Sequence, residues 1–243
     1  MLKEIKPVKL LENVYALGLG ILLKKEKVFI LGDLHIGYEE YLNKQGILIP
    51  REQFKLTKNL LEKTLATIKP EKIIVNGDLK HEFGTISKQE WIETLKIFDI
   101  LTQSCKEIIL VKGNHDTILE PLANKRNFEV KDYVIVGNIC ITHGHKLLKE
   151  TKELKNIKTI IIGNDHPAIS IKDGIKSELY KCFLVGKWQR KNLIVMPSFL
   201  PIIEGTDIRK EKTLSPYLKQ KLSDFKVFVV GDKIYEFGKL KDI

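Results

Sequence analysis

The sequence predicts an α/β fold in which two packed, mixed β-sheets are flanked by helices. Short apolar runs alternate with helical patterns in the first half of the chain, and strand-like runs dominate the second half. This order of elements is typical of two sheets that pack together with helices outside them. The chain has 243 residues, and we expect a single domain over residues 1–243.

Three strands are predicted in the first half, at 28–31, 72–75 and 108–111, where the residues are mostly apolar. Each run is followed at once by a short polar segment that contains glycine. Ligands of open α/β sheets bind at the carboxyl ends of the strands. We therefore expect these polar segments to lie together at one edge of a sheet.

Two helices separate these strands. Pro50 is placed to open a helix that runs to about Ile68 with one apolar face, and Pro70 stops it. Ser87 and Glu90 have the spacing of a capping box, so we expect a second helix to begin there.

The second half is predicted to be mainly strand. The runs are 133–136, 139–142, 159–162, 225–230 and 233–237. Gly137-Asn138 separates the first two runs as a hairpin turn would, and Gly231-Asp232 lies between the last two.

The composition is that of an ordinary globular protein, with 43% hydrophobic and 30% charged residues. The net charge of +10 would attract phosphate-bearing partners, nucleic acid among them, but the abundance of lysine along the chain could equally reflect genome composition. No apolar stretch reaches the ~20 residues of a membrane span, and the first residues lack the apolar run and the cleavage site that a signal peptide would have. We expect a cytoplasmic protein without a membrane partner. The oligomeric state is open.

Three scattered cysteines, Cys105, Cys140 and Cys182, lack the spacing of a zinc finger. An odd number of cysteines without a C-x-x-C pair indicates a reducing compartment rather than a disulfide framework. Each lies among apolar residues, so we expect all three to be small core side chains.

Metal-binding side chains follow the predicted strands. Asp33 and His35 are two residues apart, so an extended chain would point both to the same side. Asp78 follows the next strand and has two oxygens with which to bridge two cations. The side chains that could bind metal are Asp33, His35, Asp78, Asn114, His143 and His166. Mixed nitrogen and oxygen donors suit manganese, iron or zinc better than calcium.

Each motif alone has an ordinary alternative, because an aspartate after a strand is often a helix cap or a turn former. All six histidines, however, lie in or beside these segments. Histidines that only filled a core would not gather in this way.

The series Asp-x-His, Gly-Asp, Gly-Asn-His-Asp, His-Gly-His and Gly-x-x-His, between residues 32 and 166, resembles the calcineurin-like metallophosphoesterase superfamily. Gly77-Asp-Leu-Lys-His-Glu-Phe83 and Met196-Pro-Ser-Phe199 further resemble a small, mainly archaeal group of phosphoesterases related to SbcD-type nucleases. The resemblance implies a four-layer αββα metallophosphoesterase fold and two divalent metal ions. Manganese is expected first, with iron, nickel or zinc as alternatives.

The resemblance also implies a role for each of these residues. One metal would be held by Asp33, His35, Asp78 and His166, and the other by Asp78, Asn114 and His143. His115 resembles the family's catalytic histidine, oriented by Asp116. The family's final motif is usually Gly-His-x-His, whereas this chain has Asn164 in place of the first histidine. Because an amide oxygen is a weaker ligand than imidazole, we expect a weaker second site, which Asp165 could help to complete.

The function implied by the resemblance is hydrolysis of a phosphoester. A phosphodiester substrate, such as a nucleotide or a nucleic-acid end, is preferred on the basis of the family and the basic charge. A phosphomonoester is the first alternative, and a degenerate scaffold without catalysis is the second. His81 and His145 have no assigned ligand role, and either a contact with substrate or a supporting position beside the metals is expected of them.

Overall fold

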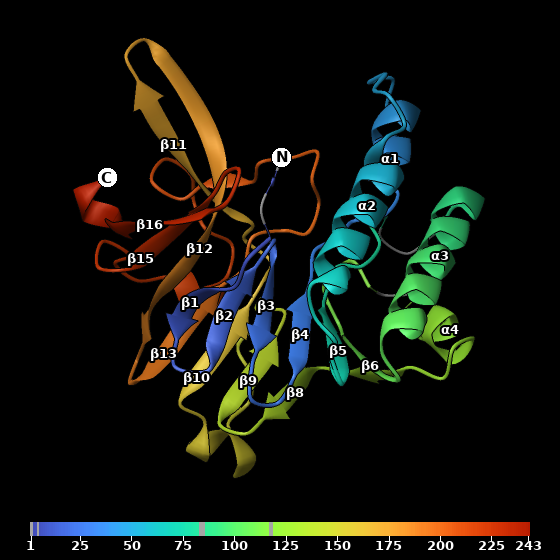
Figure 1. Cartoon of the computed structure of the whole chain (residues 1–243), viewed down its shortest axis with the longest axis horizontal. Coiled ribbons are helices and arrows are strands. Elements are labelled where there is room, and N and C mark those ends of the chain that lie inside the picture. The colour runs from blue at the N-terminus through green and yellow to red at the C-terminus, as the bar shows by residue number, and fades with distance from the viewer. Residues whose placement is uncertain (1, 4, 83–85, 117–118) are drawn as a thin grey trace.

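The computed structural model describes residues 2–3, 5–82, 86–116 and 119–243, and its strands form two sheets (Figure 1). The seven strands of the first sheet lie side by side in chain order. They are β1 (Val8–Leu11), β2 (Val14–Leu17), β3 (Gly20–Leu23), β4 (Val28–Leu31), β5 (Lys72–Asn76), β6 (Glu107–Val111) and β7 (Glu129–Lys131). β1 to β4 pair antiparallel, and β4 to β7 pair parallel.

The second sheet has nine strands and is also mixed. They are β8 (Tyr133–Val136), β9 (Ile139–Thr142), β10 (Thr159–Ile162), β11 (Pro167–Asp173), β12 (Lys176–Trp188), β13 (Lys191–Val195), β14 (Thr206–Asp207), β15 (Lys226–Val230) and β16 (Ile234–Lys239). Its main path runs β14-β11-β12-β13-β10-β9-β8, and β15 joins β12 and carries β16. β11 and β12 form a long hairpin that projects beyond the rest of the molecule (Figure 1).

The α-helices cover one face of the first sheet (Figure 1). They are α1 (Tyr38–Lys44), α2 (Gln53–Ala66), α3 (Lys88–Ser104) and α4 (Leu119–Asn124). In β4, Phe29 packs with the helices, whereas its neighbour Ile30 packs against the second sheet. Because successive side chains of a strand point to opposite faces of the sheet, the first sheet contributes to two cores, one under the helices and one between the sheets.

The outer face of the second sheet is covered by short 3-10 helices and loops. Two of these segments are the 3-10 helices Pro216–Leu218 and Leu240–Asp242. Their residues Tyr217, Leu218 and Leu240 form a third apolar core with residues of β10, β12 and β15. The structure confirms two mixed sheets flanked by helices.

The predicted strands and the hairpin are confirmed. β8 and β9 pair antiparallel around Gly137, which has the positive φ of 58° that the turn requires. The capping box is also confirmed, because the Ser87 side chain accepts a hydrogen bond from the Glu90 amide at 3.0 Å. All three cysteines are buried with free thiols.

α2 begins at Gln53, three residues later than the position of Pro50 predicted. The reason is a cap supplied by another helix. Glu39 of α1 accepts hydrogen bonds from the backbone amides of Glu52 and Gln53 at 2.9 and 2.7 Å. Backbone amides in the first turn of a helix lack partners within the helix, and Glu39 supplies one.

The N-terminal strands β1 to β3 were not predicted. Glycines at 18 and 20 interrupt the apolar pattern of this stretch. Phe83, which ends one of the motifs noted above, lies outside the described residues. No helix in the described part of the chain has the length and apolar character needed to cross a membrane.

Candidate metal centre

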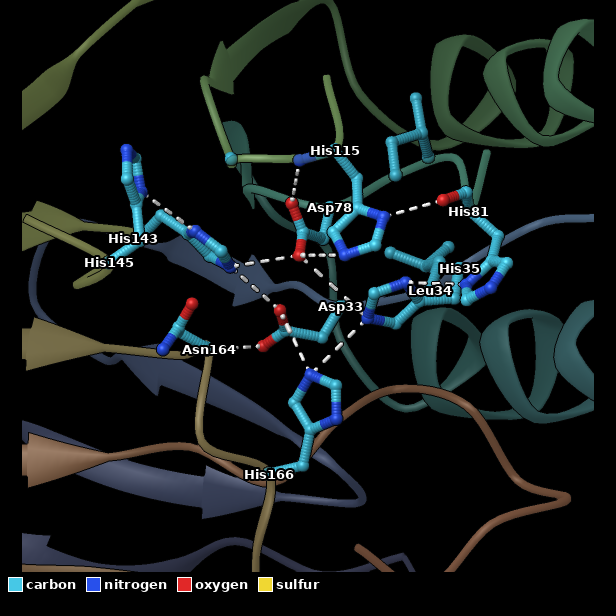
Figure 2. Close-up of polar contacts among 12 residues, drawn as sticks. Asp33, Leu34, His35, Asp78, His81, His115, His143, His145, Asn164 and His166 are labelled. Atoms are coloured by element: carbon cyan, nitrogen blue, oxygen red, sulfur yellow. Dashed lines mark hydrogen bonds and ion pairs between the residues drawn. The ribbon is translucent and has the colours of Figure 1, made fainter. Parts of the chain in front are cut away.

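The polar segments that follow β4, β5, β6, β9 and β10 meet at one edge of the two sheets (Figure 2). The parallel pairing of β4 with β5 and of β5 with β6 brings the first three together. The parallel pairing of β9 with β10 does the same for the other two. Residues distant in sequence therefore converge because the sheets place their strand ends side by side.

Asp33 is buried between two imidazoles. Its Oδ1 lies 2.9 Å from Nε2 of His143 and 3.3 Å from Nε2 of His166. Its Oδ2 accepts a hydrogen bond of 3.1 Å from the backbone amide of Asn164. The carboxylate is thus held by the loops that follow β9 and β10 of the second sheet.

Asp78 occupies the centre of the cluster. Its Oδ2 lies 3.5 Å from Nε2 of His143, 3.8 Å from Nε2 of His115 and 3.9 Å from Nε2 of His35. Its Oδ1 accepts a hydrogen bond from the His115 amide at 2.9 Å. One oxygen that faces ligands of both expected metal sites is the arrangement that a bridging carboxylate needs.

His35 and His166 complete the cluster, with their Nε2 atoms 3.3 Å apart. His166 is the more open of the two, with 23% of its side chain exposed against 7% for His35. His115, at 16%, is also partly open. The cluster is therefore open to solvent on the side of His115 and His166.

The backbone of the cluster is unusual. Asp33, His35, Asp78, Asn164 and His166 all have positive φ, between 44° and 68°. Non-glycine residues rarely adopt this conformation, and it gathers at functional sites where the surroundings enforce it. Asp33 and His35 converge on His166 as predicted, but through left-handed turns and not by continuing an extended strand.

Two glycines serve the site by their lack of a side chain. A Cβ on Gly113 would lie 2.0 Å from Oδ1 of Asp78, and one on Gly163 would lie 2.3 Å from Oδ2 of Asp33. Neither glycine has a positive φ, so these two positions need glycine for close approach and not for a turn.

His115 is oriented by a backbone carbonyl. Its Nδ1 lies 2.5 Å from the carbonyl oxygen of His81. Asp116, which was expected to orient it, accepts hydrogen bonds from the amides of Leu79 and Gly113 at 3.1 and 3.0 Å. That expectation is therefore corrected. The short Asp116 side chain is used to join the loops that carry Asp78 and His115.

The side chains of Asn114, Asn164 and Asp165 were also expected at the second metal site. Asn114 is an exposed residue, and the Asn164 side chain donates to Asp165 at 3.3 Å. The carboxylate of Asp165 accepts hydrogen bonds from the amides of Leu214 and Ser215. Asp165 is thereby tied to the loop at 214–215. The ligand roles of Asn114 and Asn164, and the part of Asp165 in the second site, stay predictions.

Gln53 is a supporting residue that the sequence did not reveal. Its side-chain amide donates to the carbonyl oxygens of His35 at 2.6 Å and Leu34 at 3.2 Å. A glutamine in the first turn of a helix is ordinary in sequence, so only its position against the Asp33–His35 turn indicates this role.

The burial of so many ionisable groups shifts their pKa values in opposite directions. Burial, with Asp33 and Asp116 nearby, raises the pKa of Asp78 to about 7. Burial disfavours the charged form of His143, but its hydrogen bond to Asp33 and the surrounding carboxylates raise its pKa to about 9. The pKa of His35 is held well below its usual range by burial and by His166.

These donors fit divalent cations. Asp33, His35 and His166 offer ligand atoms that all lie within 4.8 Å of one another, and so do Asp33, Asp78 and His143. Two buried carboxylates close together are unfavourable unless a cation compensates them. Imidazole and carboxylate together suit transition metals such as manganese, iron and zinc.

The sequence profile of the calcineurin-like phosphoesterases matches residues 26–201, and the chain belongs to this family. The family consists of hydrolases that act on phosphoester bonds with the help of divalent metal ions, and the donor cluster lies inside the matched segment. No curated protein sequence matches the chain.

Several solved structures are similar to the chain at low sequence identity, and the first of them shares its fold. Nuclease MPE of Pseudomonas putida is 14% identical with a TM-score of 0.69, over 96% of this chain and 100% of that one. YfcE, a phosphoesterase of E. coli, is 12% identical with a TM-score of 0.41, over 84% and 88%. Vps29 of Entamoeba histolytica, solved with zinc, is 16% identical with a TM-score of 0.36, over 87% and 91%.

Proposed function

We propose that this phosphoesterase is a phosphodiesterase that uses two divalent cations, manganese by preference, to hydrolyse nucleotides or nucleic-acid ends. The observation that carries the proposal is the position of Asp78. One of its oxygens faces His35, His143 and His115 at 3.5 to 3.9 Å. The carboxylate thus stands between the two expected metal sites and the expected catalytic histidine.

The chain's own residues would hold the cations in two unequal sets. The first set is Asp33, His35, Asp78 and His166, and the second is Asp78 and His143 with the amide oxygens of Asn114 and Asn164. When bound, such cations supply Lewis acidity and lower the pKa of the attacking water. The amide-containing set is the weaker, because neutral oxygens attract a cation less than carboxylates do.

His115 would stabilise charge on the phosphoryl group and protonate the leaving oxygen. Its Nδ1 faces the His81 carbonyl, so this nitrogen must carry a proton. Its Nε2 is then the nitrogen that faces Asp78 and the open side of the site. A positioned imidazole of this kind can act as a general acid.

A diester is preferred over a monoester because of the family to which the chain belongs and the basic charge of the chain. The net charge of +10 supports a nucleotide or nucleic-acid substrate, and the fold shared with a nuclease agrees with it.

A paired assay tests the proposal. The purified protein is given manganese and either a bis-aryl phosphate, a mono-aryl phosphate or an end-labelled oligonucleotide. We expect the highest kcat/KM for the diesters. A higher kcat/KM for the mono-aryl phosphate would make the chain a phosphomonoesterase, and turnover of none of the three would support a scaffold role.

The His115→Ala variant tests the catalytic assignment. Turnover of a diester with a poor leaving group should fall by about 10²–10⁴-fold, the usual contribution of general acid catalysis. Manganese content should stay near that of the wild type, because His115 is not among the expected ligands. An unchanged kcat would show that His115 has no catalytic role. A substrate with a good leaving group is a poor test, because it needs little protonation.

A further inference from the structure

Two histidines without an assigned role each face a histidine of the metal centre. Nδ1 of His81 lies 3.3 Å from Nδ1 of His35, and Nδ1 of His145 lies 3.1 Å from Nδ1 of His143 (Figure 2). In both pairs the inner ring turns its other nitrogen, Nε2, toward Asp33 or Asp78. The same geometry therefore occurs once beside each expected metal site.

The proton positions follow from this geometry. An imidazole that binds a metal through Nε2 carries its proton on Nδ1 and needs an acceptor for it. For His35 that acceptor is Nδ1 of His81, and for His143 it is Nδ1 of His145. A neutral outer ring must then carry its own proton on Nε2.

His81 is held firmly for this task. Its backbone amide donates to the Ile36 carbonyl at 3.0 Å and to Glu90 Oε1 at 2.9 Å. Its ring lies edge-on to those of Tyr38 and Tyr41, with centroids 4.8 and 4.7 Å away. The backbone bonds fix the position of the residue, and the two tyrosine rings restrict the rotation of its imidazole.

The side chain and the backbone of His81 have separate partners. The side chain faces His35, whereas the carbonyl oxygen faces His115. A substitution at residue 81 changes the first contact and keeps the carbonyl of the second. The two roles can therefore be separated by experiment.

We propose that His81 and His145 are positioning residues, which accept the Nδ1 proton of His35 and of His143 and so fix the tautomer that binds metal through Nε2. They are neither metal ligands nor substrate contacts in this proposal. It rests on the metal-dependent function proposed above. Its test does not, because manganese affinity is measured without substrate.

The experiment titrates metal-free protein with manganese and follows free manganese by electron paramagnetic resonance. His81→Phe and His145→Phe keep a ring but remove the acceptor, and we expect each to weaken one site by about 10–100-fold. His81→Asn and His145→Asn place an oxygen near the former Nδ1 and should restore most of the affinity. The number of manganese ions bound at saturation should stay as in the wild type.

Three results would overturn the proposal. Wild-type affinity in both phenylalanine variants would remove the positioning role. Loss of a whole manganese ion at saturation would make the histidine a ligand. For His81 this is a real alternative, because His35, His81 and His115 offer nitrogens close enough together to hold an ion. A raised KM with unchanged manganese affinity would make it a substrate contact.

A second comparison covers the case in which a phenylalanine variant does not fold. The oxygen of Asn reaches the former Nδ1 position, whereas that of Gln reaches the Nε2 position. We expect His81→Asn to bind manganese more tightly than His81→Gln, and equal affinities would refute the proposal. A wild-type chain that binds manganese but hydrolyses no phosphoester would refute the proposed function alone, since the affinities still decide this inference.

Discussion

Gly113→Ala should disable the centre through a single methyl group. The added Cβ would lie 2.0 Å from Oδ1 and 2.3 Å from the amide nitrogen of Asp78, whereas ordinary contacts begin at 3.4 Å. The carboxylate and its backbone would have to move by about 1 Å, a displacement that typically costs about 10²-fold in rate. That loss corresponds to about 2.7 kcal/mol of transition-state stabilisation. Manganese affinity should fall with it, because Asp78 serves both expected sites.

The assay is kcat/KM on a bis-aryl phosphate at saturating manganese, together with thermal unfolding to show that the variant is folded. Gly231→Ala is the matched control. A Cβ there meets no atom closer than 3.6 Å, and the residue has no positive φ. Gly231→Ala should therefore keep wild-type activity. Wild-type kcat/KM and manganese affinity in Gly113→Ala would refute the argument that Asp78 must remain where it is.

Three further predictions concern the metals and pH. Asp78→Asn should lose manganese more completely than Asp33→Asn or Asn114→Ala, as elemental analysis after desalting would show, and one or two retained ions would contradict the bridging role. Asn164→His should tighten the weaker site and lower the manganese concentration needed for activity, and an unchanged manganese titration would exclude Asn164 as a determinant. For the metal-free protein, the raised pKa values of His143 (about 9, from 6.5) and Asp78 (about 7, from 3.8) both mean that the folded state holds more protons. Their stabilising contribution is complete below the unfolded pKa and is lost as pH rises through the folded one, so the melting temperature measured with a chelator should fall between pH 6 and pH 9. A flat or rising melting temperature over this range would contradict the shifts.

The sequence alone determined which residues could form the centre. Hydrophobic periodicity located β4, β5, β6 and the hairpin of β8 and β9, because burial imposes a local pattern on a strand. The Ser87 capping box located the start of α3, because a helix start exposes amides that need partners within the same turn. The motifs that follow these strands then indicated the family, a conclusion that the profile match over residues 26–201 supports.

Only the tertiary structure decided how those residues are oriented. The left-handed backbone of Asp33, His35 and Asp78 is imposed by neighbouring loops, as in the hydrogen bond from the Asp33 amide to the Gly77 carbonyl at 2.9 Å. No local pattern encodes a contact between segments 44 residues apart, such as the one that separates Asp33 from Gly77.

The same reason explains the roles that were misassigned or missed. Asp116 follows His115 in sequence, yet it bonds the amides of Leu79 and Gly113, while the carbonyl of His81 takes the orienting role. Gln53 reaches the Asp33–His35 turn only because α2 packs beside it. A local sequence pattern shows which polar residues follow a strand. The hydrogen-bond partner of each polar group, however, depends on which loops the folded sheets bring within about 3 Å of it.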